Sequence, residues 1–174
     1  MENIKKKFWK YLPEFVYGSI DGTVTTFAII AGVAGARLDP SIVLILGFSN
    51  VFADGFSMAS SNYLSEESHQ DQTKHEARQH TAPWKTALAT FFSFITVGSV
   101  PLIAYVVSYF SPQTIQNEFR TASILTFFTF FIIGLIRGKV AHASGLKTAL
   151  QTCIIGIIAA SVAYFVGALL KNIA

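Results

Sequence analysis

Charged residues and cysteines are scarce in this sequence, and each scarcity excludes a class of protein. Only 13% of the 174 residues are charged, whereas a soluble domain carries about a quarter. The single cysteine, Cys153, excludes an intrachain disulfide framework. Formal net charge is only +3, and the pattern of basic residues does not indicate a nucleic-acid-binding face. Apolar residues are abundant, at 52% of the chain. This composition indicates a protein whose solvent is partly lipid.

Five apolar segments are predicted to be membrane-spanning helices: 15–36, 41–64, 84–110, 119–136 and 148–170. Four of them reach the roughly 20 residues that cross a bilayer, and the fourth in order is nearer the lower limit of about 17. Helices are expected because an unpaired backbone inside hydrocarbon is too costly. Pro101 predicts a kink in the third segment. The predicted fold class is an all-α integral membrane protein with five transmembrane helices in one domain, residues 1–174.

Lysine and arginine are divided unevenly between the two ends of these helices. Three of the 13 fall on one side, namely Arg37, Arg120 and Lys171. The other ten fall on the side of the N-terminus: Lys5, Lys6, Lys7, Lys10, Lys74, Arg78, Lys85, Arg137, Lys139 and Lys147. Positive charge favours the cytoplasmic side of a membrane. We therefore predict a cytoplasmic N-terminus, a C-terminus outside, and a cytoplasmic connection over 65–83.

Small residues recur at four-residue spacing in the first and last segments. Gly18 and Gly22 form a GxxxG pair, and Gly156 begins a similar series in 148–170. Such spacing lets helices approach closely. Two interpretations stay open, tight packing inside one monomer or a homodimer whose contact is made by the first helix.

Two aspartates, Asp21 and Asp54, fall inside segments that are otherwise apolar. An acidic residue within a membrane is costly, and such residues usually mark an ion or proton pathway. Lysine and arginine occur only at the ends of the segments, so the sequence offers the aspartates no obvious salt-bridge partner. Protonation, water or a bound cation would relieve the cost. The structural alternative is that each aspartic acid is protonated and bonds a neighbouring hydroxyl.

The second segment carries a polar stripe in which residues follow one another at four-residue spacing: Asn50, Asp54, Met58 and Asn62. Residues four apart share one helical face, and Asp21 with Thr25 is the expected partner across from it. A thioether is a soft donor that favours transition metals over calcium or magnesium. We predict a metal pathway made by Asp21, Asn50, Asp54 and Met58, with Asp21 and Asp54 also carrying protons. Ordinary apolar packing is the alternative for Met58.

The connection SEESHQDQTKHEARQHT is rich in acidic residues and histidine. If the second helix continues beyond the membrane, Glu67, Asp71 and His75 lie along one face. These three are predicted to form a site that collects a divalent cation. A solvated charged helix is the alternative.

Two stretches resemble the vacuolar iron transporter family. They are YGSIDGTVTTFAIIAGVAGA, residues 17–36, and LILGFSNVFADGFSMASSNYLSEES, residues 44–68. The resemblance implies a five-helix protomer that forms a homodimer and exports Fe²⁺, often also Mn²⁺, from the cytosol in exchange for protons. It maps family pathway residues onto Asp21 and Met58, and it sets Asn50 where some vacuolar members have a glutamate.

Vacuolar members of that family insert a glutamate- and methionine-rich domain between the second and third helices, so the short connection here is typical of a short form. We expect such a compact member in a prokaryotic cell (inner) membrane. No cofactor is expected, since the metal is cargo, and the partners are metal ions, protons, lipid and a second copy. A passive cation channel or a non-transporting scaffold is the alternative; an intramembrane enzyme is disfavoured because FADGF lacks a GxGD arrangement.

Overall fold

The computed structural model describes residues 10–72, 82–111 and 113–172, and within these ranges it contains helices and connections but no strand. The helices are α2 (Leu12–Ala36), α3 (Ser41–Gln72), α4 (Pro83–Gly98), the 3₁₀ helix η1 (Val100–Leu102), α5 (Ile103–Phe110), α6 (Glu118–Val140) and α7 (Gly145–Leu170). Since α4, η1 and α5 follow one another as a single span, five helical spans are long and apolar enough to cross a membrane. The predicted all-α fold with five transmembrane helices is confirmed.

Proline and left-handed or capping residues set the helix ends. Pro13 and Pro83 lie in the first turns of α2 and α4, where the missing N–H costs nothing. Arg37 ends α2 with a left-handed backbone at φ 59°. Asn117 caps α6 by accepting a hydrogen bond of 2.9 Å from the backbone N–H of Arg120. Pro101 lies in η1 and interrupts the third span, which confirms the predicted kink.

α3 and α6 run furthest beyond the ranges that the apolar pattern predicts, while α2 and α7 begin three residues early, at Leu12 and Gly145. α3 continues past residue 64 to Gln72, so the predicted connection over 65–83 is helical in its first part. Hydrogen bonds at four-residue spacing support this polar extension, from Tyr63 to Glu67 at 3.3 Å and from Gln70 to Glu66 at 3.1 Å. α6 spans 118–140 rather than 119–136, because basic side chains in its last turn complement the helix dipole.

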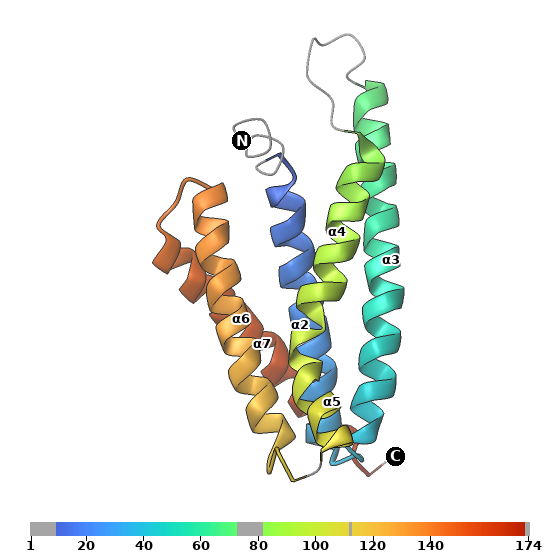
Figure 1. Ribbon diagram of the computed structural model, residues 1–174, viewed down its shortest axis with the longest axis vertical. Coiled ribbons are helices and arrows are strands. Elements are labelled where there is room, and N and C mark those ends of the chain that lie inside the picture. Colours follow the sequence, from blue (N-terminus) through green and yellow to red (C-terminus); the bar gives the residue numbers. More distant parts are fainter. Residues whose placement is uncertain (1–9, 73–81, 112, 173–174) are drawn as a thin grey trace.

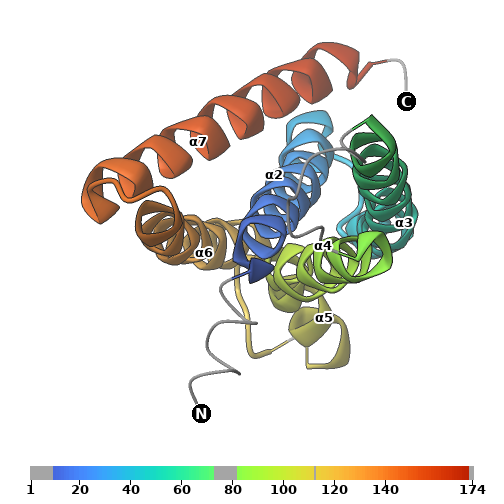
Figure 2. The ribbon, with the colours of Figure 1, turned by 90° about the horizontal axis from the view of Figure 1, so that it is seen from above.

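The central helix is α2, which contacts α3, α4, α6 and α7. Figure 1 shows the helices side by side, with the N-terminus at one end and the C-terminus at the other, and α3 reaching beyond the rest at the N-terminal end. Seen from above, α2 lies between α7 and α4, and α7 runs obliquely across the outside (Figure 2). Half of the most apolar stretch of α2 is buried, against 11% in α7. α7 is therefore the least buried of the five spans within the single chain.

Small residues pack the helices within the monomer. A Cβ at Gly18 would lie 2.6 Å from the carbonyl oxygen of Thr90, and one at Gly22 would lie 2.7 Å from that of Phe94, both on α4. At the other end, a Cβ at Gly35 would lie 2.9 Å from the carbonyl carbon of Tyr164 on α7. For these residues the interpretation as packing inside one monomer is confirmed, since α4 and α7 occupy the space that a second copy would need.

Candidate metal pathway

One face of α2 carries two carboxylates toward α3. Glu14, Tyr17 and Asp21 follow at spacings of three and four, so they share that face. Glu14 is half-buried, whereas Asp21 is exposed on the single chain. The hydroxyl of Thr25 donates to the backbone carbonyl of Asp21 at 2.8 Å. Thr25 is therefore occupied by its own helix, and the Asp21 carboxylate is left to other partners.

The polar stripe predicted on α3 is present as one half-buried face. Asn50, Asp54, Met58 and Asn62 are each partly covered, while the serines beside them, Ser57, Ser61 and Ser65, are exposed. Asn62 donates through its side-chain amide to the hydroxyl of Thr90 on α4 at 2.7 Å. Asn50 keeps a buried side-chain nitrogen with no hydrogen-bond partner among the described residues. The stripe thus faces the bundle, and one of its amides fixes the rotation of α3.

The carboxylates of α2 and α3 meet in two pairs. Asp21 and Asp54 are close enough for their charges to interact, and so are Glu14 and Glu66 nearer the N-terminal end. Both pairs join like charges, which repel unless a proton or a cation intervenes. Asp21 thus lies within electrostatic reach of Asp54 on the stripe, and the part of both residues in a metal pathway stays a prediction.

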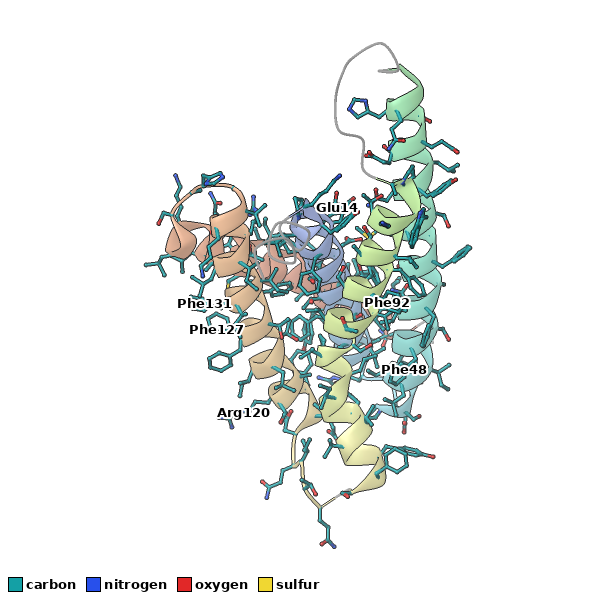
Figure 3. The ribbon with its side chains drawn as sticks, turned by 45° about the horizontal axis from the view of Figure 1, so that its top comes forward. Glu14, Phe48, Phe92, Arg120, Phe127 and Phe131 are labelled. Atoms are coloured by element: carbon teal, nitrogen blue, oxygen red, sulfur yellow. The ribbon has the colours of Figure 1, made fainter. Side chains whose placement is uncertain are left out.

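A cavity of about 430 Å³ opens between the same two helices at the N-terminal end. Its lining is Pro13, Glu14 and Tyr17 from α2 with Met58, Ser61, Asn62 and Ser65 from α3. One carboxylate oxygen of Glu14 is buried there and has no hydrogen-bond partner among the described residues. Figure 3 shows Glu14 near the N-terminal end of α2. Carboxylate, thioether, amide and hydroxyl groups thus converge on one opening.

Glu14 is the functional candidate that the sequence analysis missed. The predicted first helix begins at residue 15, which left Glu14 outside it. The signal that could have found it is its spacing of seven from Asp21, which sets both on one helical face. An acidic residue in the first turn also complements the helix dipole, so a purely local interpretation competes with the functional one.

The predicted collection site is only partly within the described residues. Glu67 is exposed and accepts the Tyr63 hydroxyl, and helix α3 carries both Glu67 and Asp71. The side chain of Asp71 and the whole of His75 lie outside the described part of the chain. Among the described residues, no three His, Cys, Asp or Glu side chains form a group that could hold a metal ion. The collection site stays a prediction.

Comparison with known proteins decides the family. The model of the VIT family matches residues 12–82 and 72–168. The chain belongs to the VIT family. The two matches meet over 72–82, between α3 and α4, which is where the family resemblance sets the shortened connection.

Curated relatives match across nearly the whole chain. The "Vacuolar iron transporter" of Plasmodium berghei (strain Anka) is 25% identical, over 93% of this chain and 83% of the relative. The protein of the same name from Centaurea cyanus is 24% identical over 87% and 84%, and "Vacuolar iron transporter 1" of Arabidopsis thaliana is 23% identical over 87% and 82%. The Plasmodium berghei alignment runs over 226 residues, more than the 174 of this member of the VIT family, so the relative carries additional residues inside the matched region.

Proposed function

We propose that this VIT-family protein exports Fe²⁺, and with it Mn²⁺, across a membrane in exchange for protons. The observation that carries the proposal is the pairing of Asp21 on α2 with Asp54 on α3, inside two helices that are long and apolar enough to span a bilayer. Intramembrane acids of this kind usually serve ions or protons. We infer iron as the cargo from the relatives that are named vacuolar iron transporter.

Metal enters this pathway through the cavity between α2 and α3. The free carboxylate oxygen of Glu14 attracts a cation to the opening, and the sulfur of Met58 gives a soft donor that calcium and magnesium do not favour. The ion then passes to Asp21 and Asp54, where two negative charges replace part of its water. A mixed set of oxygen and sulfur donors binds moderately, which suits a site that must also release.

Protons drive release in this proposal. Two neighbouring carboxylates repel each other unless a cation or a proton intervenes, so a divalent ion and protons compete for the pair in this proposal. Protonation from the far side removes the charge that held the metal. With the N-terminus in the cytoplasm, as the distribution of lysine and arginine predicts, the direction is export from the cytosol.

A second copy completes the pathway in this proposal. Asp21 is exposed on the single chain, and apolar side chains cover the outer face of α3, with Phe52 at 56% and Phe56 at 68% exposure. A homodimer that joins these faces would shield the acids from acyl chains. The short connection between α3 and α4 supports our interpretation of the protein as a short form of the family. The relatives from Plasmodium, Centaurea and Arabidopsis are eukaryotic, so they do not support the expected location in a prokaryotic inner membrane. That location stays a prediction.

Transport into proteoliposomes tests the exchange. We expect Fe²⁺ flux, kept reduced with ascorbate, to follow an imposed pH gradient and to move protons the opposite way. Asp21→Asn removes a titratable group while keeping its size, and Asp39→Asn, outside the spans, is the matched control. Coupled flux should be lost in the first variant and kept in the second. Metal flux that ignores the pH gradient would show a passive channel instead, and unchanged coupling in Asp21→Asn would remove Asp21 from the mechanism.

A further inference from the structure

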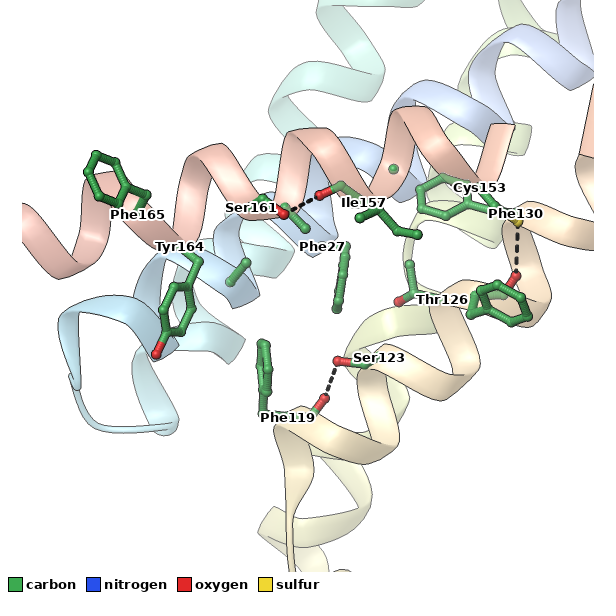
Figure 4. Close-up of a pocket in the computed structure, with 14 residues that line it drawn as sticks. Phe27, Phe119, Ser123, Thr126, Phe130, Cys153, Ile157, Ser161, Tyr164 and Phe165 are labelled. Carbon is green, nitrogen blue, oxygen red and sulfur yellow. Dashed lines mark hydrogen bonds between the residues drawn. The ribbon is translucent and has the colours of Figure 1, made fainter. Parts of the chain in front are cut away.

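A second cavity, separate from the metal pathway, lies between α2, α6 and α7. Its volume is about 650 Å³, within the range of ligand-binding pockets. Its lining includes Phe27, Phe119, Phe127, Phe130 and Tyr164 (Figure 4). The cavity exists because α7 is oblique: it packs on α6 near Gly134 and on α2 near Gly35, and diverges from α6 between these contacts.

The cavity offers no free hydroxyl from its serine or threonine residues. Ser123 donates to the Phe119 carbonyl, Thr126 to the Ala122 carbonyl and Ser161 to the Ile157 carbonyl, each at 2.7 Å and within its own helix. Apart from the Tyr164 hydroxyl and the Cys153 thiol, such a lining has little to offer a metal ion or water. The cavity is open at the surface of the bundle, where Phe127 and Phe165 are exposed. An apolar guest is what the chemistry suits.

The dimensions of the cavity match one leaflet. It begins at Phe119, in the first turn of α6, and ends at Phe130, whose ring closes it against Gly156. Eleven residues of helix rise about 16 Å, close to half of a hydrocarbon core of about 30 Å. The guest would therefore run from the membrane surface to its middle.

A positive charge stands at the surface end. Arg120 follows Phe119 on α6, is exposed, and lines an adjoining groove of about 570 Å³ with Ser123 and Phe127. Within the described ranges Arg120 makes no ion pair. Figure 3 shows its side chain projecting from α6 at the end opposite Glu14. The positive charge of Arg120 complements the phosphate of an anionic phospholipid, and the adjoining apolar cavity complements its acyl chain.

We propose that this cavity binds one acyl chain of an anionic phospholipid, whose phosphate lies against Arg120. The lipid fills the space that the oblique course of α7 leaves open and thereby joins α6 to α7 in the leaflet on the C-terminal side. The site is independent of the identity of the transported ion, because it shares no residue with the cavity between α2 and α3.

Photolabelling of the full chain in vesicles tests the proposal. The probe is phosphatidylglycerol that carries a diazirine midway along one acyl chain, diluted into phosphatidylcholine. After irradiation, we expect adducts concentrated in residues 119–130 and 153–165 rather than on the exposed face of α4, which carries Leu88 and Phe92. Ala160→Phe fills the cavity and should lower this labelling to that of the α4 face. Ile158→Phe, on an exposed position of the same helix that does not line the cavity, is the matched control and should leave labelling unchanged.

A second labelling experiment tests the contact between Arg120 and the lipid headgroup. Arg120→Gln should reduce labelling by phosphatidylglycerol about fivefold, the effect of one cation near an anionic lipid, and should leave labelling by the same probe on phosphatidylcholine unchanged. Even labelling of all lipid-facing segments, no effect of Ala160→Phe, or equal labelling by the two lipids in the wild-type protein would overturn the proposal. A second copy on this face would do so too, and would give disulfide dimers of Tyr164→Cys in a Cys153→Ala background.

Discussion

The side-chain amide of Asn62 on α3 donates a hydrogen bond of 2.7 Å to the hydroxyl of Thr90 on α4. Thr90 is fully buried, and its hydroxyl in turn donates to the carbonyl of Thr86 at 3.1 Å. The bond therefore joins the polar stripe of α3 to a buried hydroxyl oxygen, which is shielded from water. Because Met58 is one turn from Asn62, the same bond holds the thioether toward the cavity that Glu14 lines.

Asn62→Leu removes this bond by replacing the amide with a branched apolar side chain. We expect the free energy of unfolding to fall by about 0.6 kcal/mol, the average for a polar contact between membrane helices. Metal transport should fall as well, because α3 is free to rotate. Thermal unfolding in detergent and flux in vesicles measure the two effects. Thr96→Leu, at an exposed position of α4 that does not line the cavity, is the control, and equal behaviour of the two variants would show that the bond does not orient α3.

The contact of α2 with α4 predicts a sharp difference between two glycines of the same helix. A Cβ at Gly22 would lie 2.7 Å from the carbonyl oxygen of Phe94, whereas one at Gly32 would meet its nearest neighbour at 3.7 Å. Gly22→Ala should therefore lower the free energy of unfolding by about 1–3 kcal/mol through overpacking. Gly32→Ala should be neutral or slightly stabilising, since alanine favours helix. Equal unfolding midpoints for the two variants would contradict the packing described.

The start of α3 depends on a carboxylate outside the membrane. Asp39 accepts a hydrogen bond of 2.8 Å from the backbone N–H of Ser41, and bonds from the Ser41 side chain and backbone lower the pKa of Asp39 below its usual value. A lowered pKa stabilises the fold fully above the unfolded value, about 3.9, and the effect is lost as the pH falls through the folded value.

The thermal midpoint of Asp39→Ala should thus lie below that of wild type at pH 7, and the gap should close below about pH 4, where the unfolded-state carboxyl begins to titrate. Asp39→Asn should keep much of the cap at every pH, because its amide oxygen accepts the same bond without titrating. A gap that is independent of pH would assign the effect of Asp39 to the turn geometry rather than to the charge.

Apolar runs and proline positions suffice to predict the five spans and the kink at Pro101, because hydrocarbon forces every backbone group into a helix. The ends were harder to predict. The extension of α3 to Gln72 is polar, and its stability comes from bonds at four-residue spacing that hydropathy does not register. The oblique course of α7 arises from where glycines allow contact, at Gly134 and Gly35, which depends on the neighbouring helices.

For the candidate site, periodicity alone predicted that Asp54 and Met58 share a face of α3, and the structure presents them on one half-buried face. The pairing of Asp21 with Asp54 needed the register between two helices, which no single segment contains. Glu14 was missed for a related reason: its free carboxylate oxygen becomes unusual only when Met58 and Ser65 of α3 close the cavity around it.

Glu14 predicts an effect on metal capture rather than on the maximal rate. Glu14→Gln removes a charge at the opening of the pathway while leaving Asp21 and Asp54 intact. We expect the apparent KM for Fe²⁺ to rise about tenfold, because a negative opening concentrates cations, and kcat to change little. Glu118→Gln is the matched control, because the Glu118 carboxylate accepts a hydrogen bond from the Ser108 hydroxyl at the opposite end of the helix bundle. An equal fall in kcat would instead place Glu14 in the translocation step.

Met58 predicts a change in ion preference with the fold retained. Leucine has a similar volume to methionine, so the free energy of unfolding of Met58→Leu should lie within about 1.5 kcal/mol of the wild-type value. It lacks the sulfur, so the preference for Fe²⁺ and Mn²⁺ over Ca²⁺ and Mg²⁺ should fall on the order of tenfold, equivalent to about 1.4 kcal/mol. Competition of these ions for flux in vesicles measures the preference. Met58→Cys keeps a soft donor on a shorter side chain and should retain part of this preference, whereas Phe92→Leu, at an exposed position of α4, should leave it unchanged. If Met58→Leu and Phe92→Leu discriminate alike, the thioether packs as an ordinary apolar group, and the oxygen donors of Asp21 and Asp54 alone select the ion.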